Sequence, residues 1–336
     1  MSGDQTSRNA PSTLRSESIL DGVALTEVRA VWGVLALVLL AVFVTYARIS
    51  PEDLYNVSHS GIRGGASRVL VYLNYPIAIV AVALVGIIYD RWRFFASSDR
   101  GNAGRVVALL SLLAVVCCLL IAVPGVVDED DLDAKVINIV PAVGVLIILI
   151  LTILTFARHG VGVPHRWSTG DRIRLWITIL LFVVSIPWYL AALGFYSDDI
   201  PGLNRLFIAE VIPAGEDHAA VHLGDHHGLS GSLLAIIAIW LTRALGQMRP
   251  TRLRGMVRGY LSLMLAYGLG NFLNDGWLEQ VVKRGWADWR VPNLTTPGLT
   301  VAWGVIVLSA ICFALILRRA DGSRSTSRVP EQMGTA

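Results

Sequence analysis

The chain has 336 residues, of which 54% are hydrophobic and 16% are charged, and its mean hydropathy is +0.60. A soluble domain carries about 25% charged residues, so this deficit indicates that much of the surface contacts lipid instead of water. The formal net charge of +3 is too small to suggest a nucleic-acid partner. The sequence also lacks a P-loop and a dinucleotide-binding glycine fingerprint, so we expect no nucleotide cofactor.

Eight apolar runs follow one another along the chain. A helix needs about 20 predominantly apolar residues to cross the hydrocarbon core of a bilayer. Several runs contain prolines, including Pro76, Pro141 and Pro187, which we interpret as kinks because neighbouring helices can satisfy the freed carbonyl groups. The sequence therefore predicts an all-α integral membrane protein, a polytopic bundle of eight transmembrane helices. The expected spans are 30–47, 69–89, 106–124, 136–157, 175–195, 228–246, 257–274 and 298–317.

The two ends of the chain differ from this pattern. Residues 1–22 and 320–336 are rich in Ser, Thr, Gly and Arg and lack apolar periodicity, so we expect disordered tails around an eight-helix domain of residues 23–319. The first apolar run begins near residue 30, which is late for a signal peptide, and no small-residue cleavage site is evident. We therefore expect the first helix to be retained.

The basic residues are distributed unevenly over the connections. Twenty of the 28 Lys and Arg residues lie in the tails and in every second connection, and eight lie in the alternate set. By the positive-inside rule both termini are predicted to be cytoplasmic, which requires an even number of spans. Lysine occurs only at Lys135 and Lys283, an arginine bias that is typical of GC-rich bacterial genomes, so the expected location is a bacterial inner membrane.

Four of the seven histidines lie in the stretch 218–227, on the predicted outer face and just before the sixth span. If the sixth helix extends through this stretch, His218, His222 and Asp225 lie within about 60° of one another, with His226 to one side. Two histidines four residues apart can bind one metal ion, and a carboxylate one turn later supplies a third ligand. The predicted metal ligands are therefore His218, His222, Asp225 and His226, binding zinc or another divalent transition metal.

Two alternatives stay open for this stretch. Gly224 and Gly228 each weaken a helix by about 1 kcal/mol, so a turn near them is the other local structure. The histidines could also bond loop backbone at the membrane surface, since imidazole suits that environment. Four histidines with Glu216, Asp217 and Asp225 in or beside them still favour metal or proton chemistry.

The seventh span carries a polar stripe that becomes more polar toward the predicted outer end. The short connection between the sixth and seventh spans indicates antiparallel neighbours, so their polar outer ends are expected to meet. Polar residues at membrane depth normally face the bundle interior or a wet cavity. We expect three of these residues, Tyr267, Asn271 and Asn274, to line a substrate pocket. The stripe consists of Tyr260, Tyr267, Asn271 and Asn274, with Asp275 beside it and Glu279 in the loop that follows.

Three carboxylates are candidate general bases toward a metal-bound water, namely Glu216, Asp275 and Glu279. Each lies in or beside one of the two predicted polar outer ends.

The pattern His218-x3-His222-x3-His226-His227 resembles one histidine box of the membrane fatty-acid desaturases and hydroxylases. Those enzymes use several separated boxes on the cytoplasmic side, whereas this chain has one block on the predicted outer side, so no membership and no di-iron site is inferred. No histidine lies in the middle of a span, so we expect no haem.

Three classes of function remain open. The leading hypothesis is a metal-dependent hydrolase or transferase that acts on a lipid-linked substrate at the outer face. A transporter or permease for a small solute is the second, in which the same histidines change protonation near neutral pH. The third is a non-catalytic membrane scaffold. The bilayer is the one partner that the composition requires, and the sequence specifies no oligomeric state.

Overall fold

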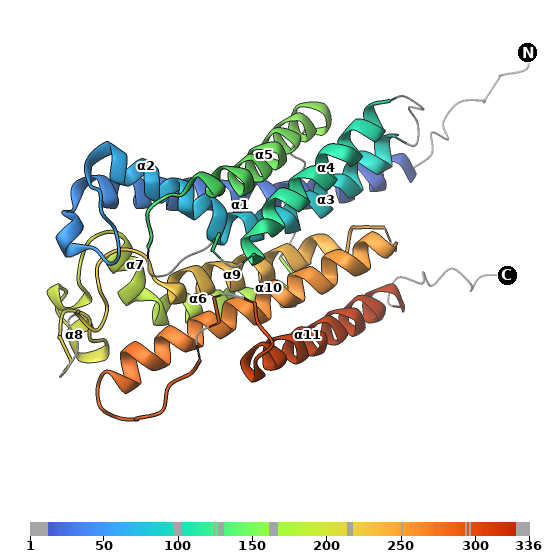
Figure 1. Ribbon diagram of the computed structural model, residues 1–336. Coiled ribbons are helices and arrows are strands. Elements are labelled where there is room, and N and C mark those ends of the chain that lie inside the picture. Colours follow the sequence, from blue (N-terminus) through green and yellow to red (C-terminus); the bar gives the residue numbers. More distant parts are fainter. Residues whose placement is uncertain are drawn as a thin grey trace, which may run out of the picture.

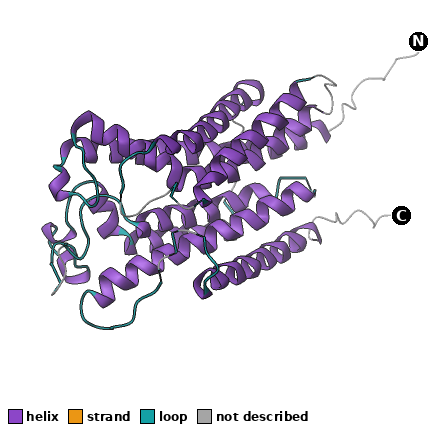
Figure 2. Cartoon of the chain, in the orientation of Figure 1, coloured by secondary structure: helices purple, strands orange, loops and turns teal. Residues whose placement is uncertain are grey.

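The computed structural model describes residues 13–96, 102–123, 125–126, 131–160, 167–213, 218–249, 251–292, 294–295 and 297–326. These residues form helices and no strand; one isolated bridge joins Leu54 to Leu223. The long helices lie side by side in an elongated bundle (Figure 1), and most of the irregular loops gather at one of its ends (Figure 2). We call this end the loop end.

Nine long helices of 12 to 36 residues form the described bundle. They are α1 (Thr13–Arg48), α2 (Gly61–Tyr72), α3 (Ala78–Ala96), α4 (Ala103–Leu119), α5 (Ile139–His159), α6 (Thr169–Val184), α9 (His227–Leu245), α10 (Arg252–Trp277) and α11 (Val301–Thr326). The short helical pieces between them are η1 (Pro51–Asp53), the π-helical turn η2 (Leu73–Ile77), η3 (Leu120–Ala122), η4 (Val136–Asn138), α7 (Ile186–Ala192), η5 (Ser197–Asp199), α8 (Leu203–Leu206) and η6 (Leu278–Val282).

The prediction of eight spans is not confirmed, although the helical membrane-type bundle is. Six helices of the described chain are long and apolar enough to cross a bilayer, and the pair α6–α7 makes a seventh if it is counted as one bent span. The helix α10 covers the expected span 257–274 and has 26 residues, but it is not apolar enough to be counted. Because α10 packs among α3, α9 and α11, it buries polar residues that a lipid-facing helix could not carry.

The three prolines act differently from one another. Pro187 is the second residue of α7, and the axes of α6 and α7 differ by 62° across Ser185. Pro76 lies in η2, where Tyr75 leaves helical geometry, and the Asn74 side chain donates to the Leu70 carbonyl oxygen at 2.6 Å. Pro141 lies in the first turn of α5, where its missing N–H is not needed, so it marks a helix start and the expected kink there is wrong.

Helical structure extends into both ranges that the sequence assigns to disordered tails, since α1 begins at Thr13 and α11 ends at Thr326. Extending an existing helix by one residue is far easier than nucleating a new one, which accounts for these extensions. Residues 1–12 and 327–336 lie outside the described residues.

The first helix begins and the last helix ends at the same end of the bundle, opposite the loop end (Figure 1). The connection from α9 to α10 lies at this end as well. That arrangement agrees with termini on one side of a membrane, while the cytoplasmic assignment of that side stays a prediction from charge.

The helices α9 and α10 pack backbone against backbone, as antiparallel neighbours. A Cβ atom added to Gly231 would lie 2.5 Å from the carbonyl oxygen of Gly268, and one added to Gly268 would lie 2.7 Å from the carbonyl oxygen of Gly231. Only glycine at both positions permits this approach, which is how small residues bring membrane helices together. The contact brings the first turn of α9 beside the last turn of α10, and this confirms that the two polar ends meet.

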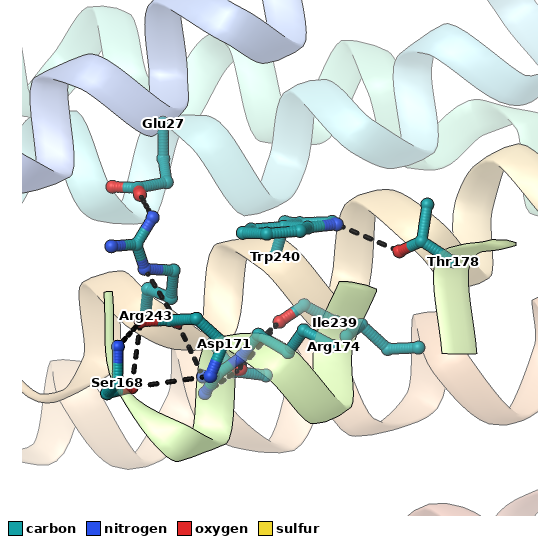
Figure 3. Close-up of polar contacts among 9 residues, drawn as sticks. Glu27, Ser168, Asp171, Arg174, Thr178, Ile239, Trp240 and Arg243 are labelled. Atoms are coloured by element: carbon teal, nitrogen blue, oxygen red, sulfur yellow. Dashed lines mark hydrogen bonds and ion pairs between the residues drawn. The ribbon is translucent and has the colours of Figure 1, made fainter. Parts of the chain in front are cut away.

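A network of buried charges joins α1, α6 and α9 away from the loop end (Figure 3). Arg243 of α9 lies between Glu27 of α1 at 2.5 Å and Asp171 of α6 at 3.1 Å. Arg174 pairs with the same Asp171 oxygen at 3.1 Å and also donates to the Ile239 carbonyl oxygen. Two cations thus face two anions, as buried charges require, and the network fixes α6, most of whose apolar side chains are exposed.

Replacing Gly231 with alanine is expected to destabilise the bundle by about 1–3 kcal/mol, because the new methyl group forces two backbones apart. The matched control is Gly255→Ala in α10, where an added Cβ meets nothing within 4 Å and alanine is the better helix former. Thermal unfolding of the two variants in detergent compares them. Equal stability of G231A and G255A would contradict the close contact of α9 and α10.

Candidate functional site

A cavity of about 340 Å³ lies at the loop end, between η1–α2, the stretch 218–227 and the end of α10. Its lining includes four histidines, three carboxylates, two arginines and one lysine. All four histidines of the predicted cluster therefore reach one cavity. Such a concentration of ionisable groups in a concave site is typical of a functional site.

The stretch before α9 is a turn and not a helix, so the predicted one-face arrangement of His218, His222 and Asp225 is wrong. Gly224 has a φ of +106°, which a residue with a side chain rarely adopts, and a Cβ atom there would lie 2.5 Å from the Tyr46 hydroxyl oxygen. The helix begins only at His227. The turn directs the residue before the helix, His226, toward α10.

Three side chains converge at this point, namely His226, Asp275 and Glu279. One potential ligand atom from each lies within 4.8 Å of the other two, and all three residues are at most 6% exposed. The His226 Nδ1 atom is 2.9 Å from the Glu279 Oε1 atom. Asp275 and Glu279 are four residues apart, and the helix continues from α10 into η6, so the two carboxylates share one face. Glu279 therefore lies in a helical turn and not in the loop that the sequence suggests.

Each of the three side chains is oriented by a hydrogen bond to a group outside the trio. The His226 Nε2–H group donates to the His222 carbonyl oxygen at 2.8 Å, since a carbonyl can only accept. The Trp188 Nε1–H group donates to Glu279 Oε2 at 2.5 Å, and the Gly228 N–H group, free in the first turn of α9, donates to Asp275 Oδ2 at 2.5 Å. The Nδ1 atom of His226 is left to face the carboxylates, and metal-binding histidines are held in this way, with the other ring nitrogen donating to a carbonyl or carboxylate.

The stacked imidazoles of His222 and His226 have pKa values shifted in opposite directions. Burial alone would lower the pKa of His226, but the adjacent Glu279 carboxylate outweighs it and raises the pKa to about 9. Burial lowers the pKa of His222 well below its ordinary value, and His226 lowers it further. Their ring centroids are 4.1 Å apart. At neutral pH in the metal-free protein, a charged His226 therefore lies against a neutral His222.

The His222 ring also has a defined tautomer. Its Nδ1–H group donates to the Leu223 carbonyl oxygen at 3.2 Å, which leaves Nε2 as a hydrogen-bond acceptor on a ring that lines the cavity. The other face of the ring stacks on Tyr55 at 4.4 Å.

The other two predicted metal ligands lie apart from the three converging side chains. Asp225 accepts hydrogen bonds on both oxygens, from Arg68 at 2.6 Å and from the Tyr72 hydroxyl at 2.8 Å. This pairing fixes the turn to α2. His218 is exposed and contacts the edge of Tyr55, on which His222 stacks.

The predicted pocket residues are distributed over three environments. Asn274 lines the cavity and donates to the Val291 carbonyl oxygen at 2.8 Å, which holds the following loop against α10. Asn271 is buried and donates to the Tyr267 carbonyl oxygen within its own helix. Tyr267 lines a different cavity, of about 140 Å³. The remaining candidate base, Glu216, lies outside the described residues.

Sequence reasoning did not find two groups that shape the site. Arg68 was a recognisable signal, because an arginine at the edge of an apolar run normally has a specific partner. The role of Trp188 had no signal, because its hydrogen bond spans 91 residues and depends on the bend between α6 and α7. Lys283 and Arg290 also line the cavity.

No known protein-family model, no curated protein and no solved structure matches this chain.

The His226–Glu279 pair predicts a pH dependence of stability in the chelator-treated protein. Because the folded-state pKa of His226 is raised from 6.5 to about 9, its stabilising contribution is complete below pH 6.5 and is lost as the pH rises through 9. Between pH 7.5 and 9.5 the wild type should lose about 2 kcal/mol through this pair.

Thermal unfolding of the wild type and of Glu279→Gln across that pH range measures the effect. The stability of the variant should change little with pH, because His226 has lost its charged partner. Glu52→Gln, at an exposed glutamate of η1, is the control and should behave as the wild type. A wild-type slope equal to that of E279Q would refute the ion pair.

Proposed function

We propose that His226, Asp275 and Glu279 bind one divalent metal ion, which serves hydrolysis or group transfer on a lipid-linked substrate at the outer membrane face. The observation that carries this proposal is a set of three buried candidate ligands, each held by a hydrogen bond to a group outside the set, at the wall of a cavity of about 340 Å³. Catalytic zinc sites have three protein ligands and one position open to water or substrate. One nitrogen and two carboxylate donors suit zinc, and also manganese or ferrous iron.

The charges of the three ligands support a cation at this position. Two carboxylates buried side by side need positive charge near them, and in the metal-free protein the proton on His226 supplies one unit. A divalent ion that replaces this proton binds a neutral imidazole and balances both carboxylates. The bound ion would lower the pKa of a water molecule toward neutrality.

The geometry favours a division of roles that differs from the sequence-based one. Asp275 and Glu279 are better placed as ligands than as bases, and His222 is better placed as the base than as a ligand. The Nε2 atom of His222 is an acceptor within the cavity, so it can take the proton from the attacking water and return it to the leaving oxygen. Lys283 and Arg290, at the same cavity, would attract an anionic group of the substrate.

The permease hypothesis is less well supported, because the cavity does not continue between α9 and α10. Below the site these helices touch at Gly231 and Gly268, which leaves no room for a solute between them.

Metal analysis tests the ligand assignment. Protein purified without a histidine tag should hold about one divalent ion per chain after reloading, measured by mass spectrometry. His226→Ala, Asp275→Asn and Glu279→Gln should each weaken binding at least tenfold, because each removes one of three ligands. The matched control is His218→Ala, which removes an exposed imidazole of the same cavity and should leave the metal content unchanged.

Two results would refute this assignment. One is a wild-type protein that holds no metal after reloading with zinc, manganese or ferrous iron. The other is a His218→Ala protein that loses metal as completely as Glu279→Gln while both remain monodisperse and folded.

The role of His222 has a separate test. His222→Ala should keep its metal but lose hydrolytic activity by about 10²–10⁴-fold, the usual contribution of a general base. Release of p-nitrophenol from p-nitrophenyl phosphate and from p-nitrophenyl laurate measures the activity. Retained activity in a metal-loaded H222A protein would assign the proton transfer to another group.

A further inference from the structure

A second cavity, of about 140 Å³, lies beside the first and is apolar in character. Its walls come from α3, α4 and η3, from α10 and from α11, and they include Leu263, Met264 and Trp303. The lining includes Leu119, which is 48% exposed on the apolar outer surface of the bundle, and exposed Pro297 in the loop before α11. The cavity therefore reaches the outer surface of the bundle.

One layer of side chains separates the two cavities. Tyr75 and Thr295 line the apolar cavity, and His227 lines the cavity of the metal site. The Tyr75 and His227 ring centroids are 6.1 Å apart, and the Thr295 hydroxyl oxygen is 3.4 Å from His227 Nδ1. A molecule in one cavity would therefore come within a side chain's width of the other.

The two cavities follow each other along α10. Between Tyr260 and Tyr267 the helix lines the apolar cavity over seven residues, a rise of about 10 Å. Further along, from Asn274 to Lys283, it lines the cavity of the metal site. The order along the bundle axis is therefore apolar and then charged, which is the order of the parts of a lipid that stands in a bilayer.

The size and charge of the two cavities define the ligand further. A protein cavity of about 150 Å³ accommodates a benzene molecule, so the apolar cavity can hold a chain segment of about six carbons. Lys283 and Arg290 at the charged cavity, together with a divalent ion, favour an anionic head group over a neutral one.

We infer that the substrate is an anionic lipid that inserts one chain, with a phosphate or carboxylate head group at His226–Asp275–Glu279 and the first part of its chain between α4, α10 and α11. To admit the chain, the Tyr75 and His227 rings between the two cavities must move apart. The head-group half of this inference rests on the proposed function, whereas the chain half rests on the apolar cavity. Free phosphate shares the head-group chemistry but would leave the apolar cavity without a role.

Photo-crosslinking of the full-length, metal-loaded protein in phosphatidylcholine nanodiscs tests the inference. The probe is dodecyl phosphate with a diazirine at the sixth carbon, and its uncharged counterpart is the dodecanol with the same diazirine. The phosphate probe should crosslink to the cavity wall at Leu263, Met264 or Trp303, at least tenfold more than the alcohol. Inorganic phosphate in excess should reduce the crosslinking by competing for the head-group position alone.

A matched pair of variants isolates the chain position. Leu263→Trp fills the apolar cavity and should reduce crosslinking at its wall at least fivefold, with metal content and the competition by inorganic phosphate unchanged. Leu273→Trp makes the same change at a 60% exposed position of α10 and should leave crosslinking as in the wild type.

Three outcomes would overturn the inference: equal crosslinking by alcohol and phosphate probes, crosslinks spread over the outer surface of the bundle, or no effect of L263W. If one of these occurs while the protein still holds its metal, the proposed function stands with a different substrate. If the protein holds no metal, the proposed function fails on that ground, and crosslinking still decides whether the cavity binds a chain.

Discussion

The contact between α9 and α10 at Gly231 and Gly268 determines where the groups of the site lie. Because the two backbones touch there, the first turn of α9 is brought beside the last turn of α10, one helix end against the other. The N-terminus of a helix carries partial positive charge, and Asp275 accepts a hydrogen bond from it. The Asp275 cap and the meeting of His226 with the two carboxylates both depend on the glycine contact. A wider spacing of α9 and α10 would move His226 away from Asp275 and Glu279.

Two regions of buried charge in the described bundle differ in their balance. At the proposed metal site two carboxylates face one imidazole, and in the network of Figure 3 two carboxylates face two guanidinium groups. The second region is balanced by its own residues, so it holds helices together and needs nothing further. In the first, two carboxylates meet a single imidazole at the edge of a cavity, and this is why we propose a cation there and not in the network of Figure 3.

Hydrophobic run length was sufficient to predict most of the helices, including α10 from the run 257–274, although α10 is too polar to be counted as a span. His226, Asp275 and Glu279 were each singled out from the sequence, His226 as a metal ligand and the two carboxylates as candidate bases. The division of roles depends on the positive φ of Gly224, which ends any helix before His226, and on partners far away in the chain. Arg68 and Asp225 are separated by 157 residues, a distance over which local periodicity carries no information. Pro141 shows the same limit, because a proline in an apolar run can mark a helix start as readily as a kink.

The positions of His226, Asp275 and Glu279 in the chain also have a consequence for biosynthesis. His226 begins one helix, and Asp275 and Glu279 end the next, so the set is complete only when α10 has been synthesised and inserted. Until then Trp188 and His226 have been made but lack the carboxylate that both of them contact. Insertion of α10 therefore supplies the missing counter-charge and the missing acceptor in one step, which makes it the event that commits the nascent chain to its final packing.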